Sequence, residues 1–161
     1  MSHNIHFICD YIIQRCEEAN VYLDLLKLQK LLYYCQAWNL AYRRGRLFEG
    51  EFQAWIHGPV SRVIYDRFIY KGMYSKISAN DVNPSLYTPS FHLPEDEAII
   101  SAVLQYYGQF TGDQLEYLTH TEQPWINARQ GYLPTQRCEN IISDEDMCNY
   151  YGQRISSATS R

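Results

Sequence analysis

Apolar residues recur at helical spacing along one long stretch of the chain, between Asp24 and Arg44. Its apolar positions follow one another at steps of three or four residues: Leu25, Leu28, Leu32, Cys35 and Trp38. Positions three and four apart lie on one face of a helix, so the stretch predicts a long amphipathic helix. Asp24 is suited to cap this helix, which we expect to run to about Arg44 and to end before Gly45.

Weaker patterns predict further helices on either side of this stretch. They are expected at residues 4–18, from Gly58-Pro59 to Lys71-Gly72, from the acidic turn Glu95-Asp96-Glu97 onward, after the capping box of Thr111 and Gln114, at residues 124–129, and from Ser143 to about Tyr151. Alternation at Phe52, Ala54 and Ile56 favours a short strand. The sequence therefore predicts a mainly α protein, a compact single-domain bundle of about six to seven helices with one short β element.

The length of 161 residues is that of one domain. We expect this domain to span residues 1–152, and residues 153–161 to form a polar C-terminal tail that is frayed from Ser156 onward. Three prolines, Pro84, Pro89 and Pro94, interrupt residues 72–94. Their spacing predicts a long loop before the helix that opens with the acidic turn.

Tyrosine is abundant, with 15 residues in the chain. A tyrosine ring packs well but its hydroxyl needs a partner, so tyrosines favour both the rim of a core and binding surfaces. Both interpretations remain open for this sequence. The net charge of -4 and the pI of about 5.7 argue against a nucleic-acid partner, because domains that bind nucleic acid usually have a basic patch and a pI above about 9.

Five cysteines occur at positions 9, 16, 35, 138 and 148, and no two of them form a CxxC pair. This spacing favours buried free thiols over a disulfide framework or a zinc site. The N-terminal residues lack the basic and apolar regions of a signal peptide, and no apolar run is long enough to span a bilayer. We therefore expect a cytoplasmic protein that does not associate with a membrane.

Two short motifs carry candidate functional residues. In the first, Trp55 and His57 precede Gly58-Pro59, and they form either an exposed ledge that a partner's backbone approaches closely or a turn that packs locally. In the second, His120 and Glu122 precede Trp125, and they form either an imidazole–carboxylate pair or a polar corner between helices. The sequence has no GxSxG, HExxH, EF-hand or phosphate-loop motif, so we expect no enzyme, no metal and no cofactor.

The long predicted helix carries two further groups of candidates. Gln29 borders its apolar face and Lys30 is expected to point outward. Gln29 either ties the helix to the His57 turn through a buried hydrogen bond or stays solvated at the boundary. Basic residues follow at Arg43, Arg44 and Arg46, where they either complement the helix dipole or contact an acidic partner.

Residues 27–38, 54–60 and 119–125 together resemble the Panacea domain family, the domain of SocA-like antitoxins and phage-associated GepA-like proteins. The resemblance implies a largely helical domain that binds and neutralises a cognate toxin protein. At least one relative delivers its toxin to a protease, so a protease or its unfoldase is a second expected partner. The partner-binding residues predicted on this basis are Gln29, Lys30, Arg43, Arg44, Arg46, Trp55, His57, Gly58, Pro59, His120 and Trp125.

Other function classes remain open beside the antitoxin interpretation. One is a small hydrolase that uses His120 with Glu122, and another is a DNA-binding regulator, against which the acidic pI argues. The oligomeric state is open as well, and a homodimer is compatible with the sequence.

Overall fold

The computed structural model describes residues 2–82 and 93–159, and it describes side chains as far as residue 155. Seven α-helices occur in these residues: α1 (Ile5–Glu18), α2 (Leu25–Arg43), α3 (Arg62–Phe68), α4 (Pro94–Tyr107), α5 (Gly112–His120), α6 (Gln123–Ala128) and α7 (Asp144–Thr159). Two 3-10 turns, η1 (Ile69–Lys71) and η2 (Ala79–Asp81), follow α3. The predicted mainly α fold is confirmed, and no described helix is long and apolar enough to cross a membrane.

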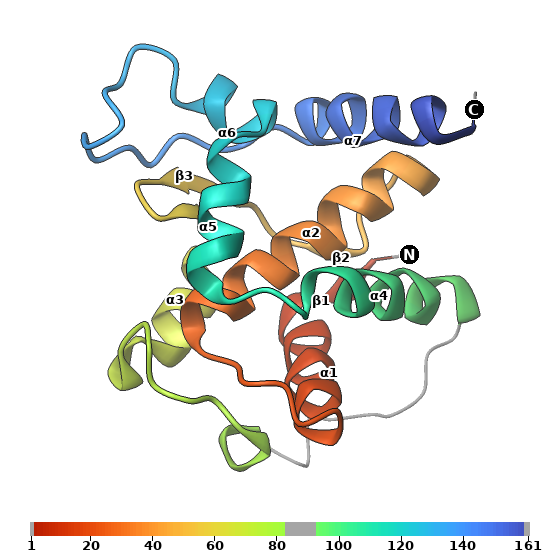
Figure 1. Ribbon diagram of the computed structural model, residues 1–161, viewed down its shortest axis with the longest axis vertical. Coiled ribbons are helices and arrows are strands. Elements are labelled where there is room, and N and C mark those ends of the chain that lie inside the picture. The colour runs from red at the N-terminus through yellow and green to blue at the C-terminus, as the bar shows by residue number, and fades with distance from the viewer. Residues whose placement is uncertain (1, 83–92, 160–161) are drawn as a thin grey trace.

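Helix α2 runs through the middle of the molecule (Figure 1). It packs against α1, α3, α4, α5 and α7, and every residue from Leu25 to Ala37 is buried, whereas Tyr42 near its C-terminal end is exposed. The predicted apolar face is buried, but so are the polar side chains of Lys27, Gln29, Lys30 and Gln36. This part of the helix has no solvent face, so its polar groups must find partners inside the protein.

Local capping signals fix several helix ends as predicted. The Asp24 carboxylate accepts a hydrogen bond from the Lys27 amide at 2.9 Å, and Thr111 forms the expected capping box with Gln114. The C-terminal end of α2 also lies where it was predicted: the helix ends at Arg43, and Arg44, with φ of 57°, takes the left-handed conformation expected after a helix. Gly45 follows it.

In the described part of the chain, four short strands form two small sheets. Strands β1 (His3–Asn4) and β2 (Phe48–Glu49) are parallel, whereas β3 (Gln53–Trp55) and β4 (Gly58–Val60) make an antiparallel hairpin with Trp55 opposite Gly58. The prediction that Gly58-Pro59 opens a helix is therefore wrong. Pairing with β3 holds residues 58–60 extended, and α3 begins only at Arg62, where Ser61 caps it.

The last helix, α7, extends to Thr159, well beyond the predicted end at Tyr151. Tyr151 is fully buried and α7 packs along α2, so tertiary packing stabilises a helix that its sequence pattern only partly indicates. The helix takes in residues 153–159, where a polar tail, frayed from Ser156 onward, was expected. Pro84 and Pro89 lie outside the described residues, whereas Pro94 is the first residue of α4.

The tyrosines divide between the core and the surface. Tyr33, Tyr34 and Tyr151 are fully buried in the core, where the Tyr33 and Tyr151 hydroxyls lie 3.2 Å apart. Other tyrosines are exposed, namely Tyr22, Tyr42, Tyr70, Tyr74, Tyr106, Tyr117 and Tyr132. All five cysteines are free, and four of them are buried as predicted, whereas Cys148 is half-buried.

Candidate partner-binding site

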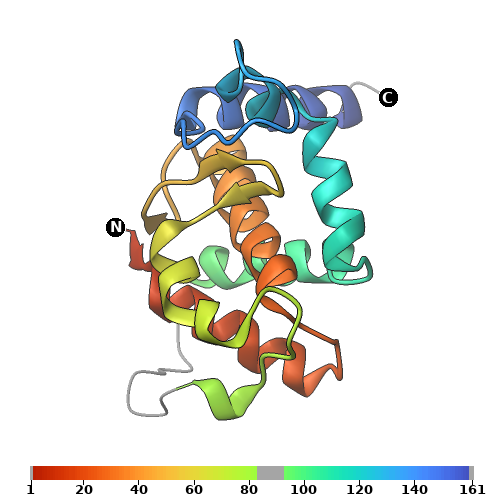
Figure 2. The ribbon, with the colours of Figure 1, turned by 90° about the vertical axis from the view of Figure 1, so that its left-hand side faces the viewer.

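The three sequence blocks singled out above meet at the β3–β4 hairpin. Figure 2 shows this hairpin in yellow beside α2, with α7 across the end of both, and β4 contacts α2 as well as α5. From the first block, Lys30 Nζ donates a hydrogen bond to the Pro59 carbonyl at 3.2 Å. From the third, Trp125 Nε1 donates to the Trp55 carbonyl at 2.9 Å. The first and third blocks therefore both hold the backbone of the second.

Gly58 stands at the closest point of this packing. Its φ of 98° is one that residues with a side chain rarely adopt. A Cβ atom placed here would lie 2.7 Å from Lys30 Cε and 2.9 Å from Thr119 Oγ1. Gly58 is thus required for the fold of the hairpin. The space beside its backbone is filled by the side chains of Lys30 and Thr119, so the backbone of a partner cannot approach it there.

Lys30 is completely buried, so the prediction that it points outward is wrong. The error arises because α3, α5 and the hairpin cover the face of α2 that would meet solvent in a surface helix. Burial lowers the pKa of Lys30 to about 7, against the weaker opposing effects of Glu116 and Asp24. Lys30 anchors the hairpin from behind and cannot contact a partner directly.

The Lys30 amine is expected to make stability depend on pH. Between pH 7 and its ordinary pKa of 10.5 the unfolded chain binds more protons at this residue, so the free energy of unfolding rises with pH. Buried Cys9 and Cys35 oppose the trend above pH 9.0, where their unfolded thiols ionise. We expect Lys30→Met to remove about 2 kcal/mol of the rise between about pH 7 and 9, as measured by urea denaturation. Equal pH dependence in both proteins would contradict this.

Gln29 forms the buried tie that the sequence suggested. Its Nε2 donates to the Ser61 carbonyl at 3.0 Å, and its Oε1 accepts from the Ser61 amide at 2.8 Å. The glutamine therefore pairs with the backbone just after β4 as a neighbouring strand would. The solvated alternative is excluded, because Gln29 is completely buried.

Loss of this tie has a measurable consequence. Gln29→Ala leaves the Ser61 amide buried without its acceptor, and we expect the free energy of unfolding to fall by about 1–3 kcal/mol. Gln29→Glu is the matched control, since it keeps the acceptor but loses the donor. Chemical denaturation of the three proteins measures both effects, and an Ala variant as stable as the parent would show that water replaces the amide.

His120 and Glu122 do not form the pair that a hydrolase would need. The Glu122 carboxylate accepts hydrogen bonds from the Tyr34 and Tyr151 hydroxyls at 2.7 and 2.8 Å. The His120 ring instead stacks on Trp125, with 4.1 Å between the ring centres, and its buried Nε2 has no hydrogen-bond partner among the described residues. Burial lowers the pKa of His120 and raises that of Glu122. The imidazole–carboxylate hypothesis is therefore wrong.

Arg129 is a structural residue that the sequence interpretation missed. It is 4% exposed, and its guanidinium donates to the carbonyls of Ala54 at 2.7 Å, Leu133 at 2.8 Å and Gln136. The same group lies over the Trp125 ring, 5.1 Å from its centre. The sequence placed Arg129 only at the end of a short helix, because nothing local to it identifies the distant strand that it supports.

The outer side of the hairpin is exposed and chemically varied. The His57 side chain is 58% exposed, and its Nδ1 lies 3.1 Å from a carboxylate oxygen of Glu116. The Trp55 ring packs edge-on against Tyr65, and the Arg62 guanidinium lies over both rings. We call Trp55, His57, Arg62, Tyr65 and Glu139 the hairpin surface; together they line a cavity of about 340 Å³.

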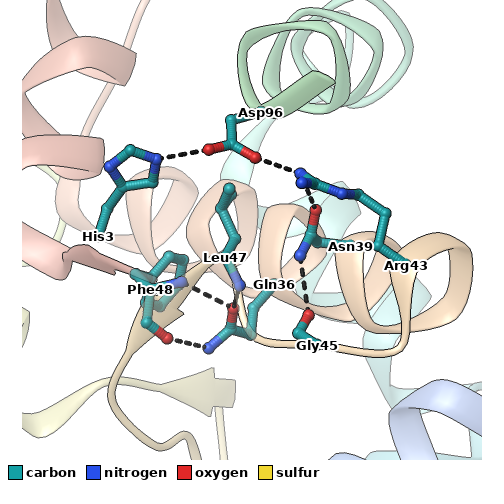
Figure 3. A network of polar contacts seen from close by, with 8 residues as sticks. All are labelled: His3, Gln36, Asn39, Arg43, Gly45, Leu47, Phe48 and Asp96. Atoms are coloured by element: carbon teal, nitrogen blue, oxygen red, sulfur yellow. Dashed lines mark hydrogen bonds and ion pairs between the residues drawn. The ribbon is translucent and has the colours of Figure 1, made fainter. Parts of the chain in front are cut away.

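The predicted arginine cluster lies at the other end of α2. Figure 3 shows Arg43 bound to Asp96, whose second oxygen is 2.7 Å from His3 Nε2. Figure 3 also shows Gln36 and Asn39 binding the backbone of the segment after α2. Arg46 Nε donates to Asp144 at 2.7 Å, and Arg44 is exposed. Arg43 and Arg46 thus already pair within the chain, and contact with an acidic partner remains a prediction.

Comparison with known proteins agrees with these blocks. Residues 28–126 match the family described as "Antitoxin SocA-like, Panacea domain", a span that covers more than half of the chain. Antitoxin SocA of Caulobacter vibrioides (strain NA1000 / CB15N) is 26% identical over 149 residues, which cover 85% of this chain and 79% of that protein. No solved structure matches the chain significantly. The chain belongs to the SocA-like antitoxin family with the Panacea domain, as the sequence blocks indicated.

Proposed function

We propose that this chain is an antitoxin that neutralises a cognate toxin protein by binding it directly through the hairpin surface. Family membership supports the antitoxin role, and the relative from Caulobacter bears the name of an antitoxin. The observation that carries the proposal is that the hairpin has one exposed side and one side that is buried against the rest of the protein. His57 is exposed, while the adjoining Gly58 and Pro59 are buried and held from behind. The protein acts in this proposal without catalysis.

The composition of the hairpin surface suits a protein contact. Tryptophan, tyrosine and arginine are enriched among the residues that dominate binding energy in interfaces, and Trp55, Tyr65 and Arg62 already pack against one another. A surface ordered before binding loses little conformational entropy when the partner arrives. Neutralisation by a folded surface therefore requires no disordered segment that wraps around the toxin.

Growth of cells that express the neighbouring gene tests this proposal. The protein should relieve the growth arrest caused by a toxin encoded there, and the double variant His57→Ala with Arg62→Ala should lose this effect. Tyr70→Ala is the matched control, because Tyr70 is 75% exposed on η1 and lies outside the hairpin surface. Equal rescue by all three proteins would contradict the assigned surface.

The amount of toxin in the rescued cells separates occlusion from delivery to a protease. Direct occlusion predicts that the toxin persists in a complex with this chain. Loss of the toxin, together with its return in cells that lack the relevant protease, would contradict occlusion and identify the chain as an adaptor.

A further inference from the structure

A second exposed area lies between α2, α4, α5 and α7, away from the hairpin surface. It is a groove of about 460 Å³, and five of its twelve lining residues are aromatic. Its lining residues include Trp38, Tyr42, Tyr106, Leu118, Glu122 and Tyr150. Tyr42 and Tyr106 are 59% and 57% exposed, an unusual amount for such large side chains. We call this area the aromatic groove.

Glu122 is the acidic residue of the aromatic groove, and it is only 6% exposed. The Tyr34 and Tyr151 hydroxyls both donate to the same oxygen, Oε1. Among the described residues, no hydrogen-bond donor reaches Oε2, and no basic side chain lies within 4.0 Å of the carboxylate. Burial raises the pKa of Glu122, as expected for a carboxylate without a cation.

The basic residue that lines the aromatic groove contacts a tyrosine and not the Glu122 carboxylate. Arg154 lies at the rim of the aromatic groove, where its guanidinium sits 3.6 Å from the centre of the Tyr150 ring and donates to the Tyr150 hydroxyl. Arg154 is exposed, and it lowers the pKa of Glu122 only weakly against the effect of burial. The carboxylate therefore has two hydroxyl donors but no counter-charge in direct contact.

A buried carboxylate is unfavourable unless a cation pairs with it, and the faces of aromatic rings attract cations. We propose that the aromatic groove binds a lysine or arginine side chain of the partner protein, with its cationic head at Glu122 Oε2 and its stem along the aromatic walls. The net charge of -4 agrees with a partner that offers basic side chains. That the partner is a toxin rests on the proposed function. That the groove binds a basic side chain rests on the chemistry of the groove itself.

A titration with small ligands tests this inference without a toxin. The probes are Nα-acetyl-arginine methylamide and Nα-acetyl-lysine methylamide, and the neutral control is Nα-acetyl-citrulline methylamide, which has nearly the shape of the arginine probe. The NMR signal of the Trp38 indole reports on the aromatic groove, because Trp38 lines the groove and its Nε1 donates at 2.8 Å to the hydroxyl of Tyr107, another lining residue. Trp55 and Trp125, the other two tryptophans, serve as internal controls.

We expect saturable shifts of the Trp38 signal with both basic probes and at least tenfold weaker binding of the citrulline probe. Glu122→Gln should weaken the basic probes at least tenfold. Its melting temperature should not fall, because the glutamine oxygen still accepts from Tyr34 and Tyr151. Glu145→Gln makes the same charge change at an exposed site on α7 and should bind normally. Equal binding of arginine and citrulline probes, unchanged affinity of Glu122→Gln, or no saturable shift would overturn the inference.

The two proposals can fail separately. Ligand binding in the aromatic groove together with no rescue of growth by the parent protein would remove the antitoxin proposal and leave the groove assignment intact. Rescue of growth by the parent and by Glu122→Gln alike would remove the groove from toxin recognition and leave the antitoxin proposal standing.

Discussion

Replacement of Gly58 by alanine is expected to lower the free energy of unfolding by about 2–4 kcal/mol. Two effects add together in this substitution. A φ of 98° strains any residue that has a Cβ atom, and the new atom would meet Lys30 Cε at 2.7 Å and Thr119 Oγ1 at 2.9 Å. Lys30 has no room to withdraw, because its side chain is completely buried. Denaturation by urea, followed by tryptophan fluorescence, measures the loss.

Two other glycines separate these effects. Gly131 has a φ of 90° but open space around the position of a Cβ atom, so Gly131→Ala should show the strain alone, about 1 kcal/mol. Gly45 has neither a positive φ nor a close neighbour, so Gly45→Ala should change little. If Gly58→Ala destabilises the protein no more than Gly131→Ala, close packing against Lys30 and Thr119 is not what makes Gly58 necessary.

Replacement of Arg129 by alanine is expected to have an effect of similar size, about 3 kcal/mol. The guanidinium satisfies carbonyls from β3 and from the segment after α6, and it also covers the Trp125 ring. Removing it leaves the Ala54 carbonyl buried without a donor, since Ala54 is 0% exposed. The loss should appear in urea denaturation together with a changed emission of Trp125.

Arg129→Lys is the matched variant, because it keeps the charge but has one nitrogen in place of the planar group that reaches three carbonyls. We expect its stability to lie between those of the parent and Arg129→Ala. A loss below about 1 kcal/mol for the alanine variant would contradict this account, because it would mean that water satisfies the carbonyls.

Gly58 and Arg129 stabilise the hairpin without contacting a partner. Variants at either position should therefore weaken toxin binding only as far as they disorder the hairpin, whereas changes at His57 or Arg62 should weaken binding and leave stability almost unchanged. Combined measurement of stability and binding distinguishes these two classes of residue.

Signals that act within a few residues were readable from the sequence. The caps at Asp24 and Thr111 depend on hydrogen bonds over three positions, and the structure has both of them. Glutamine beside an apolar stripe left two alternatives open at Gln29, and the structure bears out the buried hydrogen bond. The three sequence blocks meet at the hairpin in the structure, but the sequence revealed neither the hairpin nor which of their side chains are exposed.

Features set by distant neighbours were not readable. Lysine is charged and usually lies at the surface, and only the packing of other elements around α2 explains why Lys30 is buried. Closeness in sequence suggested His120 as one possible partner of Glu122, whereas its actual partners come from α2 and α7. Gly58-Pro59 resembles a helix start, but pairing with β3 makes it a strand. Each error arose where a contact distant in sequence outweighed a local preference.

Photo-crosslinking from the hairpin surface tests the central claim most directly. p-Benzoylphenylalanine would replace His57 in one protein and Tyr70 in a control, each co-expressed with the toxin and irradiated in cells. Direct neutralisation through the hairpin predicts a covalent adduct with the toxin from position 57 and none from position 70. Growth rescue by the position-57 protein without any adduct to the toxin would contradict direct contact through this surface.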